Sequence, residues 1–243
     1  MSLNITQNWD GVTAPAIPAG WNADSQMITS TARYTSSPNC MYLNDSANTK
    51  RYVTYGTSSG DDFAVATLST TVFLAIGGVD GFTYKGGISY RASSGTISNA
   101  TGVYYWAYFN WGGGAPELRL ASVNNGTVTD ITTRSITGTV DNVWMTIQAR
   151  CSGTLHQVAF IRNSDGYYLD NTGNFVSGAT YAISTTNATI TTGNYCGLVA
   201  SGQTNLNRVY LDDFSVTSQA ANQVIPHAIY VPIPRGHFTE DWG

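Results

Sequence analysis

The chain has 243 residues, of which 42% are hydrophobic and only 11% are charged, and its formal net charge is −4 at pH 7. This length is enough to bury one large core, and the missing basic field excludes nucleic-acid binding, whose affinity depends mainly on neutralising phosphates. The surface must then be built mostly from uncharged polar residues, which suits proteins that contact sugars or sister subunits.

The sequence starts with polar residues and shows no signal peptide. No apolar stretch approaches the roughly 20 residues of a membrane span. We therefore expect a soluble protein without a membrane partner, which stays in the cell that makes it, leaves by lysis, or has lost a leader. The cysteines Cys40, Cys151 and Cys196 lack the spacing of a zinc or disulfide framework and are expected to be buried or half-buried free thiols.

Short segments rich in Val, Ile, Thr, Tyr and Phe recur along the chain, whereas helical periodicity is almost absent. Turn-forming clusters such as "SSGDD", "NNGT" and "NSDG" separate these segments. The pattern predicts an all-β, two-sheet antiparallel sandwich. In chain order, the expected strands cover residues 51–57, 62–70, 71–78, 86–93, 102–111, 117–123, 143–152, 156–164, 194–201 and 208–218.

Two of these strands carry further information. Residues 143–152 alternate between apolar and polar side chains, as a half-buried strand requires. In residues 208–218 the alternation breaks down around Asp212 and Asp213, which predicts a β-bulge at this acidic pair.

The composition changes at about residue 220, where the strand pattern ends and a proline-punctuated tail begins. We predict one sandwich domain over residues 1–219 and an extended arm over residues 220–243. Prolines exclude a helix in this arm, and its apolar side chains need a groove on the same sandwich or on a neighbouring subunit. The predicted contact residues of the arm are Ile225, Pro226, Ile229, Tyr230, Val231, Pro232, Ile233, Phe238 and Trp242.

Four motifs, taken in order, resemble the concanavalin A-like, laminin-G-type jelly roll found in lectin modules, bacterial surface proteins and viral structural proteins. They are "NWDGVTAPAIPAGW", "GISYRASSG" with "GVYYWAYFN", "VWMTIQARCSGTLHQVAFIRNSDG" and "GLVASGQTNLNRVYLDDFSVTS". The ordered set spans residues 5–218. The resemblance implies a jelly-roll sandwich whose first and last strands lie side by side, but a fold alone does not fix a function.

Catalytic signals are weak. Glycoside hydrolysis needs two convergent carboxyl groups, yet the chain has only the glutamates Glu117 and Glu240. The neighbours within the pairs Asp61–Asp62 and Asp212–Asp213 should point to opposite faces of a strand. No G-x-S-x-G nucleophile elbow is present, and the three histidines lack partners for zinc. We therefore expect a protein that is not an enzyme.

Calcium is the one metal that the residues suggest. Asp10 lies beside the first strand that the resemblance implies, Asp212 and Asp213 lie on the last, and the implied fold would bring these carboxylates together as a structural calcium site. The alternative is that they serve in ordinary turns and caps.

The segment "VYYWAYFNWGGG" carries six aromatic rings in nine residues beside a glycine-rich loop. One interpretation is a glycan platform on which Tyr104, Trp106, Tyr108 and Trp111 stack sugars. The other is packing, because alternation places Tyr104, Trp106 and Tyr108 on one face of a strand whose two faces include the core.

The leading functional prediction is a non-enzymatic virion protein of a bacteriophage. It would be a capsid decoration or cement protein, or a tail or fibre component, that docks on other virion subunits and on copies of itself. The alternative is a carbohydrate-binding, lectin-like module, extracellular or at a surface, serving for example as a host-surface adhesin.

Overall fold

The computed structural model describes residues 3–35, 39–44, 49–56, 63, 65–75, 83–97, 101–112, 115–202 and 209–219. The predicted arm at residues 220–243 and the pair Asp61–Asp62 lie outside these ranges. The contacts expected of the arm therefore stay predictions.

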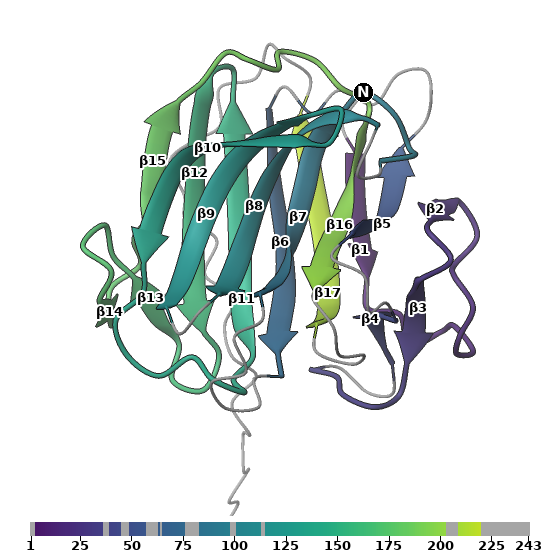
Figure 1. The fold of residues 1–243 in the computed structure, drawn as a ribbon, viewed down its shortest axis with the longest axis horizontal. Coiled ribbons are helices and arrows are strands. Elements are labelled where there is room, and N and C mark those ends of the chain that lie inside the picture. Colours follow the sequence, from purple (N-terminus) through teal and green to yellow (C-terminus); the bar gives the residue numbers. More distant parts are fainter. Residues whose placement is uncertain are drawn as a thin grey trace, which may run out of the picture.

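Strands form two antiparallel sheets that lie face to face as two layers (Figure 1). The larger, ten-stranded sheet has the order β14-β13-β12-β11-β6-β17-β4-β3, with β1 added beside β17 and β15 beside β12. Its strands are β1 (Leu3–Gln7), β3 (Met27–Ser30), β4 (Cys40–Leu43), β6 (Val65–Leu74), β11 (Met145–Ser152), β12 (Leu155–Arg162), β13 (Tyr167–Leu169), β14 (Phe175–Val176), β15 (Ile183–Thr186) and β17 (Val209–Gln219).

The second sheet has seven strands in the order β10-β9-β8-β7-β16-β5-β2. These are β2 (Trp21–Ala23), β5 (Lys50–Gly56), β7 (Thr83–Ala92), β8 (Val103–Gly112), β9 (Ala115–Asn124), β10 (Thr127–Ser135) and β16 (Tyr195–Gly202). The main apolar core lies between the sheets, where Tyr105, Ala107 and Phe109 of β8 pack with Ile147 of β11 and Leu211 of β17. The two-sheet sandwich predicted from the sequence is confirmed.

The ends of the sandwich also agree with the jelly-roll expectation. β1 pairs antiparallel with β17, from Leu3 opposite Ser218 to Gln7 opposite Phe214.

All three cysteines are buried free thiols, as predicted. In the part of the chain that the structure describes, no helix is long and apolar enough to cross a membrane.

The bulge predicted at the acidic pair is present in β17. The register with β6 shifts between Asp212 and Ser215, and Asp213 adopts a positive φ of 49°. This kink changes the direction of the second carboxylate, so the expectation that the two side chains diverge is wrong. The Thr35 hydroxyl donates to Asp212 Oδ2 at 2.9 Å and also lies 2.6 Å from Asp213 Oδ2.

A second irregularity places a charged side chain inside the sandwich. The register between β7 and β16 shifts at Arg91, whose φ is 50° and whose side chain is 1% exposed. The guanidinium donates to three backbone carbonyls from separate segments: Phe63 at 3.2 Å, Ile190 at 3.2 Å and Gly153 at 2.6 Å. Arg91 therefore ties together three parts of the chain that are far apart in sequence.

His156 of β12 is fully buried between Tyr90 and Tyr105. Its Nε2 lies 3.2 Å from the Asn187 carbonyl and its Nδ1 lies 2.9 Å from the Tyr90 hydroxyl. Because a carbonyl only accepts, Nε2 carries the proton, and Nδ1 accepts from Tyr90. Burial lowers the pKa of His156 to about 4, although the bond to the Asn187 carbonyl opposes this shift.

This histidine makes stability depend on pH. The folded pKa is below the unfolded value of about 6.5, so the stabilisation is complete above pH 6.5 and is lost as the pH falls through 4. We expect the loss to be on the order of 2–3 kcal/mol. Urea unfolding at several pH values should show a steeper decline for the wild type than for His156→Gln. Parallel declines for both proteins would contradict the assignment.

Candidate functional site

The face of the seven-stranded sheet that points away from the other sheet, here called the outer face, carries a band of polar side chains. Strand register places five residues side by side across five neighbouring strands. We call them the polar row: Lys50 of β5, Ser201 of β16, Lys85 of β7, Asn110 of β8 and Glu117 of β9. Lys50, Lys85 and Glu117 are half-buried, whereas Ser201 and Asn110 are buried, so the row reaches solvent through its three charged members.

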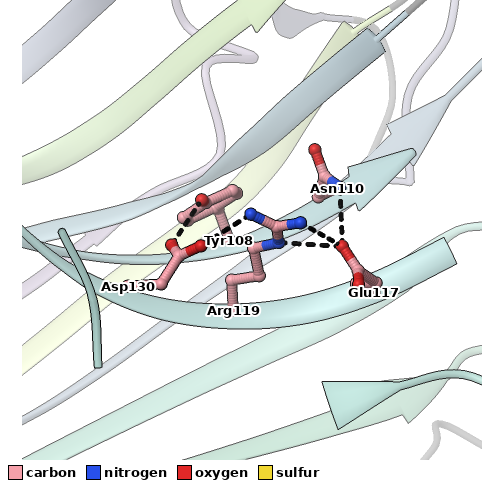
Figure 2. Close-up of polar contacts among 5 residues, drawn as sticks. All are labelled: Tyr108, Asn110, Glu117, Arg119 and Asp130. Atoms are coloured by element: carbon pink, nitrogen blue, oxygen red, sulfur yellow. Dashed lines mark hydrogen bonds and ion pairs between the residues drawn. The ribbon is translucent and has the colours of Figure 1, made fainter. Parts of the chain in front are cut away.

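Arg119 of β9 organises one end of the row (Figure 2). Its Nε donates to Glu117 Oε2 at 2.8 Å, its Nη2 also contacts that oxygen, and its Nη1 donates to Asp130 Oδ2 at 2.7 Å. The Tyr108 hydroxyl donates to Asp130 Oδ1 at 3.3 Å. Burial raises the pKa of Tyr108, and the neighbouring Asp130 raises it further, so the phenol stays protonated.

Asn110 has an unused acceptor. Its Nδ2 donates to Glu117 Oε2 at 3.1 Å. Its Oδ1 is buried without a hydrogen-bond partner, although the residue as a whole is 5% exposed. In Figure 2 this oxygen points away from Glu117 and Arg119. Since buried polar atoms nearly always have a partner, this oxygen is suited to a donor from a ligand.

The two lysines of the row differ in their partners. Lys50 Nζ donates to the Gly126 carbonyl in the β9–β10 turn at 3.1 Å. Lys85 makes no hydrogen bond or ion pair within the described part of the chain. Burial lowers the pKa of both ammonium groups, and Lys85 lowers that of Lys50 further. Arg119 also lowers the pKa of Lys85, whereas Asp130 raises it.

The aromatic side chains that share the outer face with the polar row are covered by other residues of the protein. Tyr104, Trp106 and Tyr108 share the outer face, as alternation predicted, but they are 0%, 0% and 1% exposed. They pack with Ile97 and with Val128 of β10. The β9–β10 hairpin curves across the upper part of the view toward β5 in Figure 1, and the Lys50–Gly126 hydrogen bond joins its turn to β5.

These rings are therefore not the open platform that the sequence predicted. Covering removes the exposed ring faces on which a sugar would stack. Trp111, the fourth predicted member, is on the opposite side of β8, where it packs against the main core.

The carboxylates predicted to bind calcium are used by the protein itself. Asp10 accepts from Asn8 Nδ2 at 2.8 Å and from the Asn39 amide at 3.2 Å. Asp212, fully buried, accepts from the Thr35 amide at 2.8 Å and from the Asp213 amide at 2.8 Å. Among the described residues, no group of three or more His, Cys, Asp or Glu could hold a metal ion. The arrangement fits the turn and cap alternative better than a calcium site.

Sequence reasoning missed the residues of the polar row. In the sequence Glu117 stands out only as an isolated glutamate, because its neighbours in the row come from other strands. One signal was available: the chain contains just two lysines, Lys50 and Lys85, and the structure places both on the same face.

No protein-family model matches the sequence, and no curated protein matches it significantly. Solved structures do share its fold. The CBM2 module of the evolved Dit protein of Lactobacillus casei BL23 phage J-1 has a TM-score of 0.55 at 9% identity, covering 89% of this chain and 96% of that one. The exoplasmic/lumenal domain of VIP36 in its Ca²⁺-bound form has a TM-score of 0.55 at 12% identity, covering 92% of each chain.

A third match is SO2946 of Shewanella oneidensis MR-1, a protein of unknown function, with a TM-score of 0.56 at 8% identity and coverage of 93% and 90%. At such identities the likeness concerns the fold alone. The chain has the concanavalin A-like, lectin-type jelly-roll fold, which confirms the resemblance seen in the sequence.

Proposed function

We propose that this chain is a non-catalytic carbohydrate-binding domain and that the polar row on the outer face holds the glycan. The observation that carries the proposal is the row itself: a line of ammonium, hydroxyl, amide and carboxylate groups, with a guanidinium at one end, that includes the unpaired Asn110 Oδ1. Sugar hydroxyl groups both donate and accept, so they match such a mixed line of donors and acceptors.

The fold supports the same proposal. VIP36 has been solved with Man2 as well as with Ca²⁺, and the phage Dit module is named as a CBM2 module. Catalysis is less well supported, because Glu117 of the row and the nearby Asp130 are both bound to Arg119. A hydrolase would need such groups to face one scissile bond.

A second candidate concerns where the domain works. We propose a bacteriophage particle, as a decoration protein of the capsid or a component of the tail or fibre, with the arm at residues 220–243 docking on neighbouring copies. The phage origin of the similar Dit module favours this setting, as does the low charge of the chain.

One experiment addresses both candidates. The full chain and a chain ending at Gln219, where β17 ends, are compared on a glycan array and by light scattering after size-exclusion chromatography. Glycan binding by both proteins is the result expected of a carbohydrate-binding domain, and assembly of the full chain alone is expected of a docking arm. A full chain that binds no glycan would refute the first proposal, and identical monomers would refute the second.

A further inference from the structure

We infer that the glycan held by the polar row is acidic, and that Lys85, with Lys50 beside it, binds the carboxylate or sulfate group of one sugar unit. This inference rests on the proposed carbohydrate-binding function and names the class of ligand.

The first step is the position of the lysines. The only two lysines of the 243-residue chain lie in one row, with only Ser201 of β16 between them. Neighbouring strands are about 4.8 Å apart, so the two lysine backbones are separated by about 10 Å. Both side chains can therefore reach one anion bound above Ser201, which is itself 4% exposed.

The second step is the balance of charge. Arg119 engages both nearby carboxylates, Glu117 and Asp130. Lys85 forms no ion pair with either of them or with any other described residue. Burial lowers the pKa of the Lys85 ammonium and Arg119 lowers it further, whereas Asp130 raises it. An anionic ligand would give Lys85 a counter-charge in direct contact, while a neutral sugar would not.

The third step is the neighbouring acceptor. Asn110 is directly opposite Lys85 in the β7–β8 register, and its Oδ1 has no partner. A hydroxyl donor is therefore expected next to the anion. A uronic acid, a sialic acid or a sulfated sugar carries an anionic group and hydroxyl groups on one ring, whereas a simple inorganic anion leaves Asn110 unpaired.

The test uses the full chain and an array of matched glycan pairs: uronate against the neutral sugar, sialylated against asialo, and sulfated against unsulfated. The wild type should prefer the acidic member of its best pair by about tenfold or more. Raising the NaCl concentration should weaken binding of the acidic member much more than binding of the neutral one.

Variants then locate the contact. Lys85→Gln should remove the preference for the acidic member, and Lys85→Arg should keep most of that preference. Arg162→Gln, a loss of charge on β12 of the other sheet, is the matched control and should behave as the wild type.

Inorganic polyphosphate should compete weakly for the glycan site, because it offers no hydroxyl donor to Asn110.

The outcomes separate the two proposals. Equal binding of acidic and neutral members by the wild type overturns the inference and leaves the proposed function intact, whereas no binding of any glycan overturns both. An unchanged preference in a folded Lys85→Gln, or polyphosphate competition as strong as that of the acidic glycan, also overturns the inference. If Lys85→Gln does not fold, the preference of the wild type and its salt dependence still decide whether the bound glycan is acidic.

Discussion

Replacing Arg91 by methionine should lower the free energy of unfolding by about 3–5 kcal/mol. Methionine keeps much of the apolar volume but provides no donors. The carbonyls of Phe63 and Ile190 would each lose a buried bond to a charged donor, and the carbonyl of Gly153 would lose a part-buried one. The Phe63 carbonyl would keep its bond from the Cys151 thiol. Each buried carbonyl that is left unpaired costs about 1–3 kcal/mol.

Urea unfolding followed by tryptophan fluorescence measures this loss. The matched control is Arg162→Met, which removes an arginine from a more exposed ion pair with Asp165. We expect that control to change stability by less than about 1 kcal/mol. If Arg91→Met were as stable as Arg162→Met, Arg91 would not hold the three segments together.

Replacing Trp106 by alanine should cost about 3–5 kcal/mol. The indole is fully buried on the outer face and stacks on Tyr108, with ring centroids 4.0 Å apart. Its removal leaves a cavity that the covering hairpin can fill only in part. A large loss of stability is the result expected of packing, whereas a sugar-stacking ring at the surface would affect binding and leave stability nearly unchanged.

Trp111→Ala, also on β8, is the comparison for Trp106→Ala. Trp111 is only half-buried, so its truncation should cost clearly less than that of Trp106. Thermal and urea unfolding of the two variants, together with glycan binding, would distinguish packing from stacking. A stable Trp106→Ala that has lost all glycan binding would show that the indole contacts the ligand.

Features that depend on nearby residues could be predicted from the sequence. Alternation in β11 and β8 identified which side chains share a face, and broken alternation located the bulge at Asp212 and Asp213. The order of the strand motifs identified the jelly roll and with it the pairing of β1 with β17. Each of these features follows from a period of two residues along a strand or from the order of strands.

Features that depend on register between distant strands could not be predicted in this way. The polar row takes one residue from each of five strands, and these residues are as far apart in the sequence as Lys50 and Ser201. No single stretch of sequence therefore contains the row. Whether Trp106 is exposed or covered depends on the path of the β9–β10 hairpin. The inward turn of Arg91 depends on a register shift that "GISYRASSG" does not reveal. In each case tertiary geometry decides what the local pattern leaves open.

The most direct test of the central claim is to locate the bound glycan on the folded protein. Backbone amide resonances of the full chain are recorded by NMR spectroscopy with and without the glycan that binds best on the array. We predict that the largest shift changes occur at Lys85, Asn110, Glu117, Arg119 and Ser201. Shift changes confined to the ten-stranded sheet, with these five resonances unmoved, would contradict the assignment of the outer face as the binding site.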